Sequence, residues 1–321
     1  MFRRISMGLA GVAMVAVLSG CGLTYSIVKP TVSSLQYANT SPDKLTIKII
    51  DKRTGDDTLF MKRTANLKNV NISLEYFTSP ISYLAENLEK ELNARSIKAV
   101  CIVGGNEKGD IALEVDRFEI INRRVSGYSP WEAFHCFKGS ITTATGTFPI
   151  HAFFFNGKVP VWSMKEIEEP CINLPLSILI KEIASKINRV AIGAKASDQA
   201  VEDLAKSIQS EVGKNDNGPF WKVFELAATN NPSAMEHLKK FTIAQDNFLK
   251  ACVFSAIGTL GPQDQFDFLK QCLAKTDEVS KFMDLKSIGD IERQEAKDFL
   301  KKIAETTNED GVKICSELYA K

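Results

Sequence analysis

Beyond residue 43 the chain alternates apolar and polar residues, and this period of two predicts β-strands. In the segment over 44–51, Leu45, Ile47 and Ile49 alternate with polar residues, which is typical of a half-buried strand. Patterns rich in β-branched and aromatic residues predict further strands over residues 98–103, 110–122, 139–147 and 151–162. The first part of the folded chain is therefore expected to contain a β-sheet.

Two local features refine these strands. Within 110–122 the apolar phase shifts near Asp116 and Arg117, which predicts a β-bulge because one extra residue changes the facing of the later side chains. The Asn156-Gly157 pair is typical of a two-residue hairpin turn, so the chain is expected to reverse direction there.

Apolar residues spaced three and four apart predict two helices among these strands. Ser79 can cap the first, with Pro80 at its first position, and the apolar stripe of that helix is made by Ile81, Leu84, Ala85, Leu88 and Leu92. The second runs over about 175–192, and Gly193 can end it. Two helices on one face of an antiparallel sheet predict a two-layer α+β domain over residues 44–195.

Residues 219–321 are helical in pattern and repeat themselves at an interval of 31 residues. The matching segments are 256–260 with 287–291, and 268–270 with 299–301, while Leu226 and Leu238 begin a third, weaker copy. This pattern resembles HEAT-like helical repeats, in which one helix pair buries its apolar face only by stacking on its neighbours. The alternative is a compact helical bundle in which the repetition is coincidental.

Polar segments separate the expected parts of the chain. Residues 21–43 are rich in Ser, Thr, Asn and Pro, which predicts a flexible tether. Residues 196–218 are expected to form a linker, because Gly213 to Pro219 is rich in turn-forming residues. Each of the two domains is then expected to close its own core and to fold alone.

The N-terminal residues have the pattern of an export signal. Arg3 and Arg4 precede an apolar run from Gly8 to Val17, which is shorter than the roughly 20 residues needed to cross a bilayer. Leu18-Ser19-Gly20-Cys21 follows and resembles the lipobox of bacterial lipoproteins. The resemblance implies that residues 1–20 are removed and that Cys21 carries the lipid.

Lipidation at Cys21 predicts a location in the envelope of a Gram-negative cell. Several acyl chains on one residue anchor a protein stably, whereas one chain binds only marginally. Gly22 follows the cysteine in place of the aspartate associated with inner-membrane retention. The resemblance therefore favours the outer membrane, with the folded body facing the periplasm.

A second resemblance covers the α+β part. The segments Ile49 to Thr54 and Leu88 to Arg95, and the order of elements up to about residue 192, are similar to the YajG-like periplasmic lipoproteins. That family has no assigned enzymatic activity, so the resemblance implies a periplasmic lipoprotein and no particular chemistry. The stretch from Trp131 to Cys136 and the long C-terminal part depart from its pattern.

Charge and reactive residues do not point to an enzyme. The formal net charge of the 321 residues is +1, so no basic excess favours a nucleic-acid partner. The three histidines are too scattered for a metal site, and neither a cofactor nor a catalytic residue is predicted. Of the seven cysteines six remain beside Cys21, and Cys136 and Cys171 are the first candidates for a disulfide in an oxidising compartment.

Two classes of function follow. The first is a non-enzymatic lipoprotein that binds or scaffolds other proteins of the cell envelope. The second is an accessory lipoprotein of a machine that transports or assembles lipid or lipopolysaccharide, and a hydrolase is a distant third. An apolar groove between sheet and helices would favour lipid handling, whereas a continuous exposed patch on the repeats would favour protein binding. The sequence does not give the oligomeric state.

Overall fold

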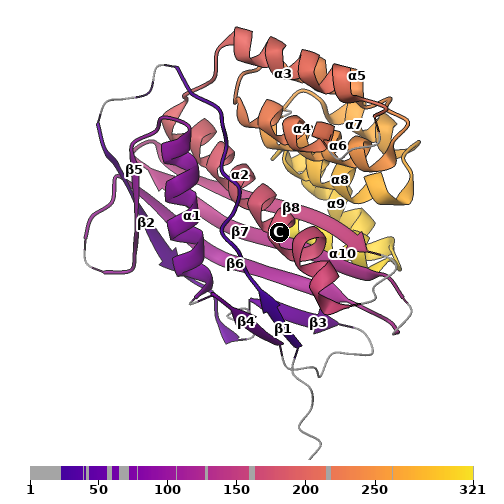
Figure 1. Ribbon diagram of the computed structural model, residues 1–321, viewed down its shortest axis with the longest axis horizontal. Helices are drawn as coiled ribbons and strands as arrows, with labels where there is room; N and C mark the ends of the chain where they lie inside the picture. The colour runs from indigo at the N-terminus through magenta and orange to yellow at the C-terminus, as the bar shows by residue number, and fades with distance from the viewer. Residues whose placement is uncertain are drawn as a thin grey trace, which may run out of the picture.

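A mixed α+β region is followed by a helical region in the computed structural model (Figure 1). Within the chain of 321 residues it describes residues 23–320 with the exception of 39, 41–42, 56–59, 65–71, 78, 106, 127–128, 159–162, 215–217 and 262. The signal and Cys21 lie outside the described residues. Among the residues that are described, no helix has the length and apolar character needed to cross a membrane.

The main sheet of the described chain is mixed. Its strands lie in the order β5 (Ala99–Val103), β2 (Leu45–Asp51), β6 (Ile111–Arg123), β7 (Trp131–Thr143) and β8 (Gly146–Lys158), with β3 (Met61–Thr64) also pairing with β6. Strand β2 is parallel to β5 and β6, whereas β6, β7 and β8 are antiparallel. The expectation of a wholly antiparallel sheet is wrong, because a crossover through a helix separates β2 from β5 and makes those strands parallel.

The bulge predicted in β6 is confirmed. The register with β7 shifts between Val115 and Arg117. The extra residue keeps Phe118 and Ile120 in the same apolar cluster as Val115. Strand β6 thereby stays buried along its whole length on that face.

The hairpin predicted at Asn156-Gly157 is wrong. Both residues lie inside β8, where Asn156 pairs with Ala133 of β7, and the reversal comes instead between Thr143 and Gly146. The side-chain oxygen of Asn156 accepts the Gly157 N–H at 2.9 Å. The pair therefore makes a local side-chain-to-backbone hydrogen bond, but the strand continues through it. Pairing along two strands of 13 residues outweighs the preference of one dipeptide.

Helices α1 (Pro80–Ala94) and α2 (Leu174–Ile187) share one apolar core with the sheet. Both predicted helices are confirmed. The Ser79 hydroxyl accepts the Ser82 N–H at 3.0 Å, which caps α1. After α2 a π-helical segment, Asn188–Ile192, ends at Gly193, whose φ of 77° lies in the left-handed region that glycine adopts without strain.

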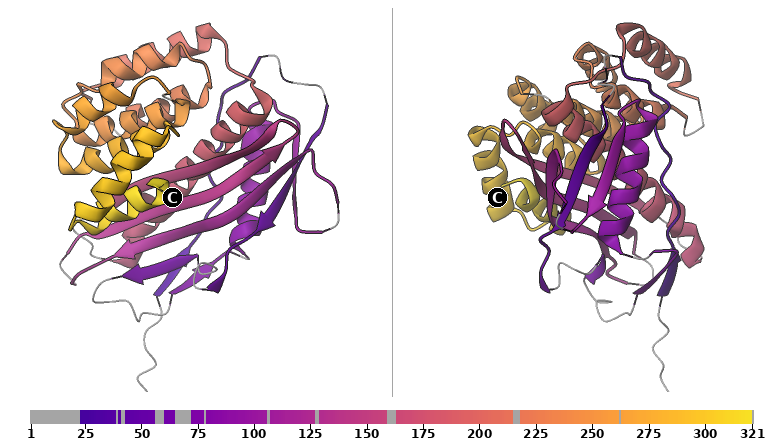
Figure 2. Two further views of the ribbon diagram at one scale, coloured as in Figure 1. Left: turned by 180° about the vertical axis from the view of Figure 1, so that it is seen from behind. Right: turned by 90° about the vertical axis from the view of Figure 1, so that its left-hand side faces the viewer.

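The opposite face of the sheet is covered by the helical region, so the molecule has three layers (Figure 2). The ring of Phe282 in α8 (Glu278–Gly289) lies 6.0 Å from Phe134 and 4.7 Å from Phe155, centroid to centroid. The last helix, α10 (Asp310–Ala320), also packs on β7 and β8. The expectation that residues 44–195 and 219–321 form separate cores is wrong, because β7 and β8 are apolar on both faces and both faces require cover.

The segment predicted as a tether is ordered over its described part. Strand β1 (Leu23–Ser26) pairs in parallel with β4 (Ile72–Glu75), and the side chains of Tyr25, Ile27, Leu35 and Tyr37 are buried. The Val28 N–H donates to the Asn173 side chain at 3.0 Å, and the Thr31 N–H donates to the Ser177 hydroxyl at 3.2 Å. The prediction of a flexible tether over 21–43 is wrong there, because Asn173, directly before α2, and Ser177 of α2 supply polar partners for the extended backbone.

Most of the predicted linker over 196–218 is helix. Helix α3 (Asp198–Glu211) begins after Ser197, whose hydroxyl accepts the Ala200 N–H. Val201, Ala205 and Ile208 of α3 are buried. The low hydrophobicity of this segment reflects one apolar stripe on a surface helix and not the absence of structure.

The interval of 31 residues corresponds to equivalent positions in successive helices. The remaining helices are α4 (Gly218–Ala228), α5 (Ala234–Phe241), α6 (Asn247–Leu260), α7 (Phe266–Leu273) and α9 (Gln294–Thr306). Leu226, Ile257, Ile288 and Tyr319 lie 31 residues apart in α4, α6, α8 and α10, and all are buried. The same interval separates three buried leucines in α5, α7 and α9, namely Leu238, Leu269 and Leu300. Helices α4, α6, α8 and α10 thus stack side by side in this order.

Two glycines at this interval allow the stacked helices to approach closely. A Cβ at Gly258 of α6 would meet Ser287 and Asp290 at α8, and a Cβ at Gly289 of α8 would meet the Tyr319 ring of α10. Residues that recur every 31 positions therefore set the distance between stacked helices as well as the burial of their apolar side chains.

Replacing Gly289 with alanine is expected to lower the stability of the folded chain by on the order of 1–3 kcal/mol, because the new methyl group has no room beside Tyr319. Helix propensity alone predicts the opposite sign, since alanine is favoured over glycine by about 1 kcal/mol. Chemical denaturation followed by circular dichroism measures the difference. Lys301→Ala, on an exposed position of α9, is the control and should change little, and a stabilised G289A variant would contradict the close contact.

Candidate functional site

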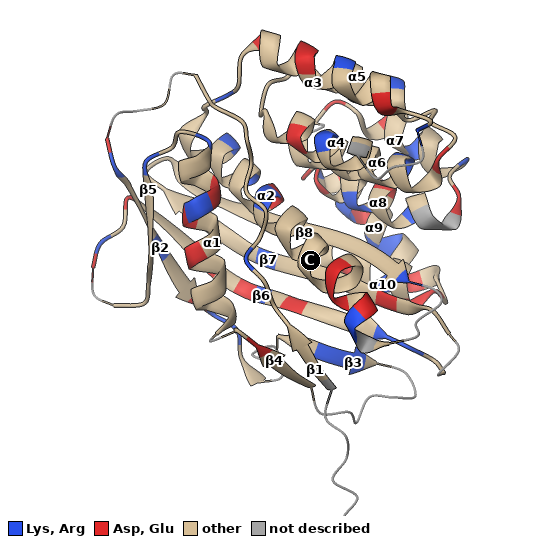
Figure 3. Ribbon diagram, viewed as in Figure 1, with Lys and Arg blue, Asp and Glu red and all other residues tan. Residues whose placement is uncertain are grey.

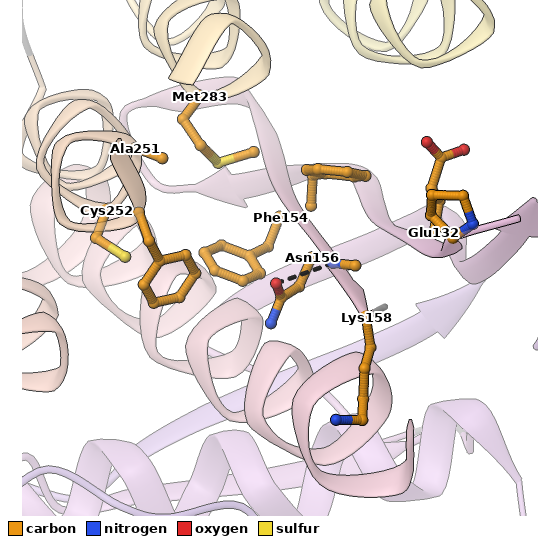
Figure 4. A pocket seen from close by; sticks show the side chains of 11 residues that line it. Glu132, Phe154, Asn156, Lys158, Ala251, Cys252 and Met283 are labelled. Carbon is orange, nitrogen blue, oxygen red and sulfur yellow. Dashed lines mark hydrogen bonds between the residues drawn. The ribbon is translucent and has the colours of Figure 1, made fainter. Parts of the chain in front are cut away.

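A cavity of about 290 Å³ lies between the C-terminal part of β8 and helices α6 and α8 (Figure 4). Its lining residues are Pro130, Glu132, Phe154, Phe155, Asn156, Gly157, Lys158, Phe248, Ala251, Cys252 and Met283. Apolar side chains from the sheet and from two repeats thus meet at one place. We refer to this cavity as the aromatic pocket.

The aromatic pocket exists because β8 is the edge strand of the sheet. Consecutive side chains of a strand point to opposite faces, so Phe154 and Phe155 flank the edge on both sides. Phe154 packs edge-on against Phe224 of α4, with ring centroids 5.6 Å apart, while Phe155 packs against Phe282. Because the helices hold both rings, the wall of the pocket is fixed in position, whereas Met283 adds a flexible thioether that adapts to a ligand.

Polar groups stand at one end of the aromatic pocket. The Asn156 amide is occupied, since its Nδ2 donates to the Pro170 carbonyl at 2.7 Å. Glu132 is paired with Arg123 at 2.9 Å. Lys158 forms no ion pair with any residue that the structure describes. The pocket therefore combines an apolar interior with one available cation at its rim.

A second cavity, of about 380 Å³, adjoins the aromatic pocket and shares Glu132 and Phe155 with it. It extends towards α10, where Asp310 and Gly311 contribute to its lining. Both cavities thus lie at the end of the sheet that holds Phe155. Together they offer more length than the aromatic pocket alone.

The reactive side chains are arranged as structural groups. Burial lowers the pKa of His135 and of His151 to about 3, so both rings are neutral at neutral pH. Burial raises the pKa of the Cys136 and Cys171 thiols to about 12, which keeps them protonated. Within the described residues, no group of three His, Cys, Asp or Glu side chains is placed to hold a metal ion.

The disulfide suggested between Cys136 and Cys171 is not formed. Both are free thiols in the structure. Cys136 belongs to the apolar cluster shared with the helical region, whereas Cys171 belongs to the cluster on the side of α1 and α2. The prediction relied on positions at strand margins, and it is wrong because the sheet stands between the two cores.

A buried ionic group joins β8, α2 and α8. Lys186 of α2 donates to the His151 carbonyl of β8 at 2.5 Å and pairs with Asp290 at 2.6 Å. Lys286 of α8 pairs with Asp290 and Glu182 as well. Because β8 has no strand beyond it in the sheet, the Lys186 amine provides a hydrogen-bond donor for an edge carbonyl. All three layers are thereby connected near the aromatic pocket.

A second buried ionic group lies on the other side of α2. Lys181 pairs with Glu225 of α4 at 2.6 Å and with Glu91 of α1 at 3.3 Å. Burial by itself raises the pKa of Glu91, but the charges of Arg95 and Lys181 and hydrogen bonds from Ser33 and Arg95 outweigh it and lower this pKa to about 2. Glu91 therefore stays ionised across the physiological range and holds α1 to α2 and α4.

Asp284 is the exception among the buried charges. It follows Met283 in α8, is fully buried, and neither carboxyl oxygen has a hydrogen-bond partner among the described residues. Burial raises its pKa to about 8, so the carboxyl group is mostly protonated at neutral pH.

Asp284→Asn is expected to stabilise the protein at pH 8 and to change little at pH 4. The pKa of this carboxyl is raised in the folded state, so its own contribution to stability is complete below about pH 4 and is lost as pH rises towards 8. The gain should be on the order of a few kcal/mol, since one pKa unit corresponds to about 1.4 kcal/mol. Unfolding curves at several pH values measure it, with the exposed Asp267→Asn as control. A gain that does not depend on pH would contradict the assignment.

The sequence pattern did not predict the aromatic pocket. One signal was present: Phe153, Phe154 and Phe155 form a continuous aromatic run, which indicates a strand buried on both faces. The other half of the site, on α6 and α8, comes from about a hundred residues further along the chain and depends on how the helical region docks.

No family model matches this chain, and no curated protein matches it. Among solved structures it is similar to protein XCC0632 from Xanthomonas campestris, described as a member of family DUF330. The sequence identity is 10%, the match covers 51% of this chain and 91% of the other, and the TM-score is 0.33. A similarity of this size establishes neither the fold nor the function.

Proposed function

We propose that this protein is a lipid-anchored, non-enzymatic lipoprotein of the cell envelope that faces the periplasm and binds an acyl chain of a membrane lipid in the aromatic pocket. The apolar pocket between sheet and helices is the observation that carries the proposal. Such a protein would serve as an accessory component of a lipid or lipopolysaccharide transport or assembly machine. The lipidated residue is Cys21, and the outer membrane is favoured.

The dimensions and chemistry of the aromatic pocket suit part of an acyl chain. Small-molecule sites are typically about 300–1,000 Å³, so a cavity of about 290 Å³ accommodates a chain segment and not a whole lipid. Each buried methylene group contributes about 0.8 kcal/mol, so several of them give useful affinity without a specific polar contact. Lys158 at the rim matches a phosphate or carboxylate headgroup.

The rest of the chain fits an accessory role. The helical region is proposed to be a HEAT-like array, supported by the buried residues that recur every 31 positions. The α+β region is proposed to be related to the YajG-like lipoproteins, on the sequence segments that carry the resemblance. Neither proposal implies chemistry on a bound ligand.

Protein binding by the helical region is the second candidate. Ile243, in the turn between α5 and α6, is 86% exposed, and it borders a separate cavity with Phe268 and Cys272. An apolar residue displayed in this way is typical of contact with an envelope protein. The two functions are compatible, because the aromatic pocket lies on the other side of α6.

Ala251→Trp is expected to fill the aromatic pocket and to abolish binding of a fluorescent fatty acid to the purified, unlipidated protein. The control is Ala244→Trp, which adds the same side chain to the cavity beside Ile243 and should leave binding unchanged. Met283→Ala enlarges the aromatic pocket and should retain or strengthen binding, which separates occlusion from misfolding. Equal binding by wild type and Ala251→Trp would refute the acyl-chain proposal.

Cys21→Ala is expected to release the protein from membranes, because the acyl anchor is lost. Cell fractionation measures the change, and density-gradient separation of the two membranes identifies the one that holds the wild-type protein. Cys272→Ala is the matched control, since it removes a cysteine from the helical region. If the membrane-bound fraction of Cys21→Ala equals that of the control, Cys21 is not the anchor.

A further inference from the structure

Two arginines surround Trp131 at the start of β7. The guanidinium carbon of Arg63 lies 4.7 Å from the centre of the Trp131 ring, and that of Arg124 lies 5.6 Å from it. Trp131 is completely buried, and its indole N–H has no acceptor among the residues described. We refer to Arg63, Arg124 and Trp131 as the arginine-tryptophan cluster.

Arg63 has no carboxylate partner in the described part of the chain. Its Nε donates to the Asn122 side chain at 2.9 Å, and Tyr25 and Arg124 act on it electrostatically. Burial lowers the pKa of Arg63, Tyr25 opposes this, and the charge of Arg124 lowers the pKa further. Arg124 is 8% exposed, and its Nε donates to the Ser126 carbonyl at 3.1 Å. The positive charges of the two neighbouring guanidinium groups together favour an additional anion beside Arg63.

The surrounding cations are already paired. Lys62 pairs with the buried Glu119 at 2.7 Å, and Arg123 pairs with both Glu132 and Asp310. Glu168, which acts electrostatically on Tyr25, accepts the Ser26 N–H at 3.1 Å. In Figure 3 the ribbon of β3, beside β1 at this end of the sheet, has the blue of Lys and Arg. Arg63 is therefore the cation best placed to meet an external anion.

The arginine-tryptophan cluster lies close to the proposed anchor. The ring of Tyr25 in β1 is 5.8 Å from that of Trp131. Cys21 precedes Tyr25 by four residues, which span at most about 14 Å when fully extended. Since β1 is fixed to β4, a lipid on Cys21 holds this end of the sheet near the bilayer.

We propose that this end of the sheet rests on the bilayer and that the arginine-tryptophan cluster binds the phosphate groups of anionic phospholipids. The location depends on the proposed lipidation of Cys21, whereas the recognition of phosphate does not. Arginine provides a planar set of donors that matches phosphate oxygens. Val125, 42% exposed beside Arg124, adds an apolar contact of the kind that enters the headgroup region.

This orientation also places the aromatic pocket at the membrane. Lys158 pairs with Trp131 across β7 and β8, and Glu132 pairs with Gly157, so the rim of the pocket and the cluster share one end of the sheet. An acyl chain can then move from the bilayer into the pocket without crossing water. The proposed ligand site and the proposed membrane surface are thus adjacent.

Binding of the unlipidated protein, with Cys21→Ser, to vesicles tests the proposal. The Cys21→Ser protein with no other substitution should bind vesicles of phosphatidylglycerol and phosphatidylcholine more tightly than vesicles of phosphatidylcholine alone. Arg63→Gln with Arg124→Gln should weaken binding to the anionic vesicles by about 30-fold, since each basic residue near a membrane contributes about 1 kcal/mol. Arg63→Gln alone should weaken it about fivefold, which guards against unfolding of the double variant.

The matched control removes two exposed lysines from the other end of the sheet. Lys44 and Lys108 lie near the start of β2 and β6, and the 13 residues of β6 separate these ends by about 40 Å. Lys44→Gln with Lys108→Gln should leave vesicle binding within twofold of wild type. Equal losses in the two double variants, or no preference for anionic vesicles, would overturn the proposal.

Inorganic phosphate distinguishes a membrane surface from a site for the free ion. At constant ionic strength, phosphate at millimolar concentration should not displace the protein from anionic vesicles. Displacement by phosphate, but not by chloride, would assign the site to the free ion and refute the membrane proposal. Every protein in the vesicle experiment carries Cys21→Ser. A negative result would therefore refute phosphate recognition by the arginine-tryptophan cluster and would not bear on the lipidation of Cys21.

Discussion

The arrangement of this protein depends on covering one edge strand. Strand β8 is apolar on both faces and carries three consecutive phenylalanines, so neither face can be left to water. Helix α2 covers one face, α8 and α10 cover the other, and Lys186 provides a donor for an edge carbonyl between them. The helical region consequently shares an apolar core with one face of β7 and β8. The aromatic pocket is the place where this cover stops short of the end of β8.

Burying ions between the layers brings specificity at an energetic cost. Removing charges from water is expensive, and the ion pairs of Lys181, Lys186 and Lys286 recover that cost only when every partner is in register. A helical region displaced by one turn would leave several charges unpaired in an apolar core. We infer that these groups select one docking position for the helices, and that apolar contacts alone would permit several.

Local patterns predicted elements better than they predicted packing. Ser79, the bulge near Arg117 and the end at Gly193 depend on neighbouring residues, and all are confirmed. The separate cores, the flexible tether and the Asn156-Gly157 turn were wrong because each was decided by residues distant in the chain. The 31-residue interval located the stacked helices, yet nothing in its periodicity shows that they dock on a sheet. Half of the aromatic pocket was therefore inaccessible to sequence reasoning.

The N-terminal segment has a mechanical consequence. The stretch over 26–33 lies along α2 and is held by the side chains of Asn173 and Ser177, and by Glu91 of α1. A pull between the proposed anchor at Cys21 and the helical region would be borne first by β1, whose hydrogen bonds to the parallel strand β4 would be loaded together. The polar contacts on α2 then carry the load one after another. Force applied at the N-terminal end of the described chain would accordingly reach the interface between α1 and α2 before it reached the stacked helices.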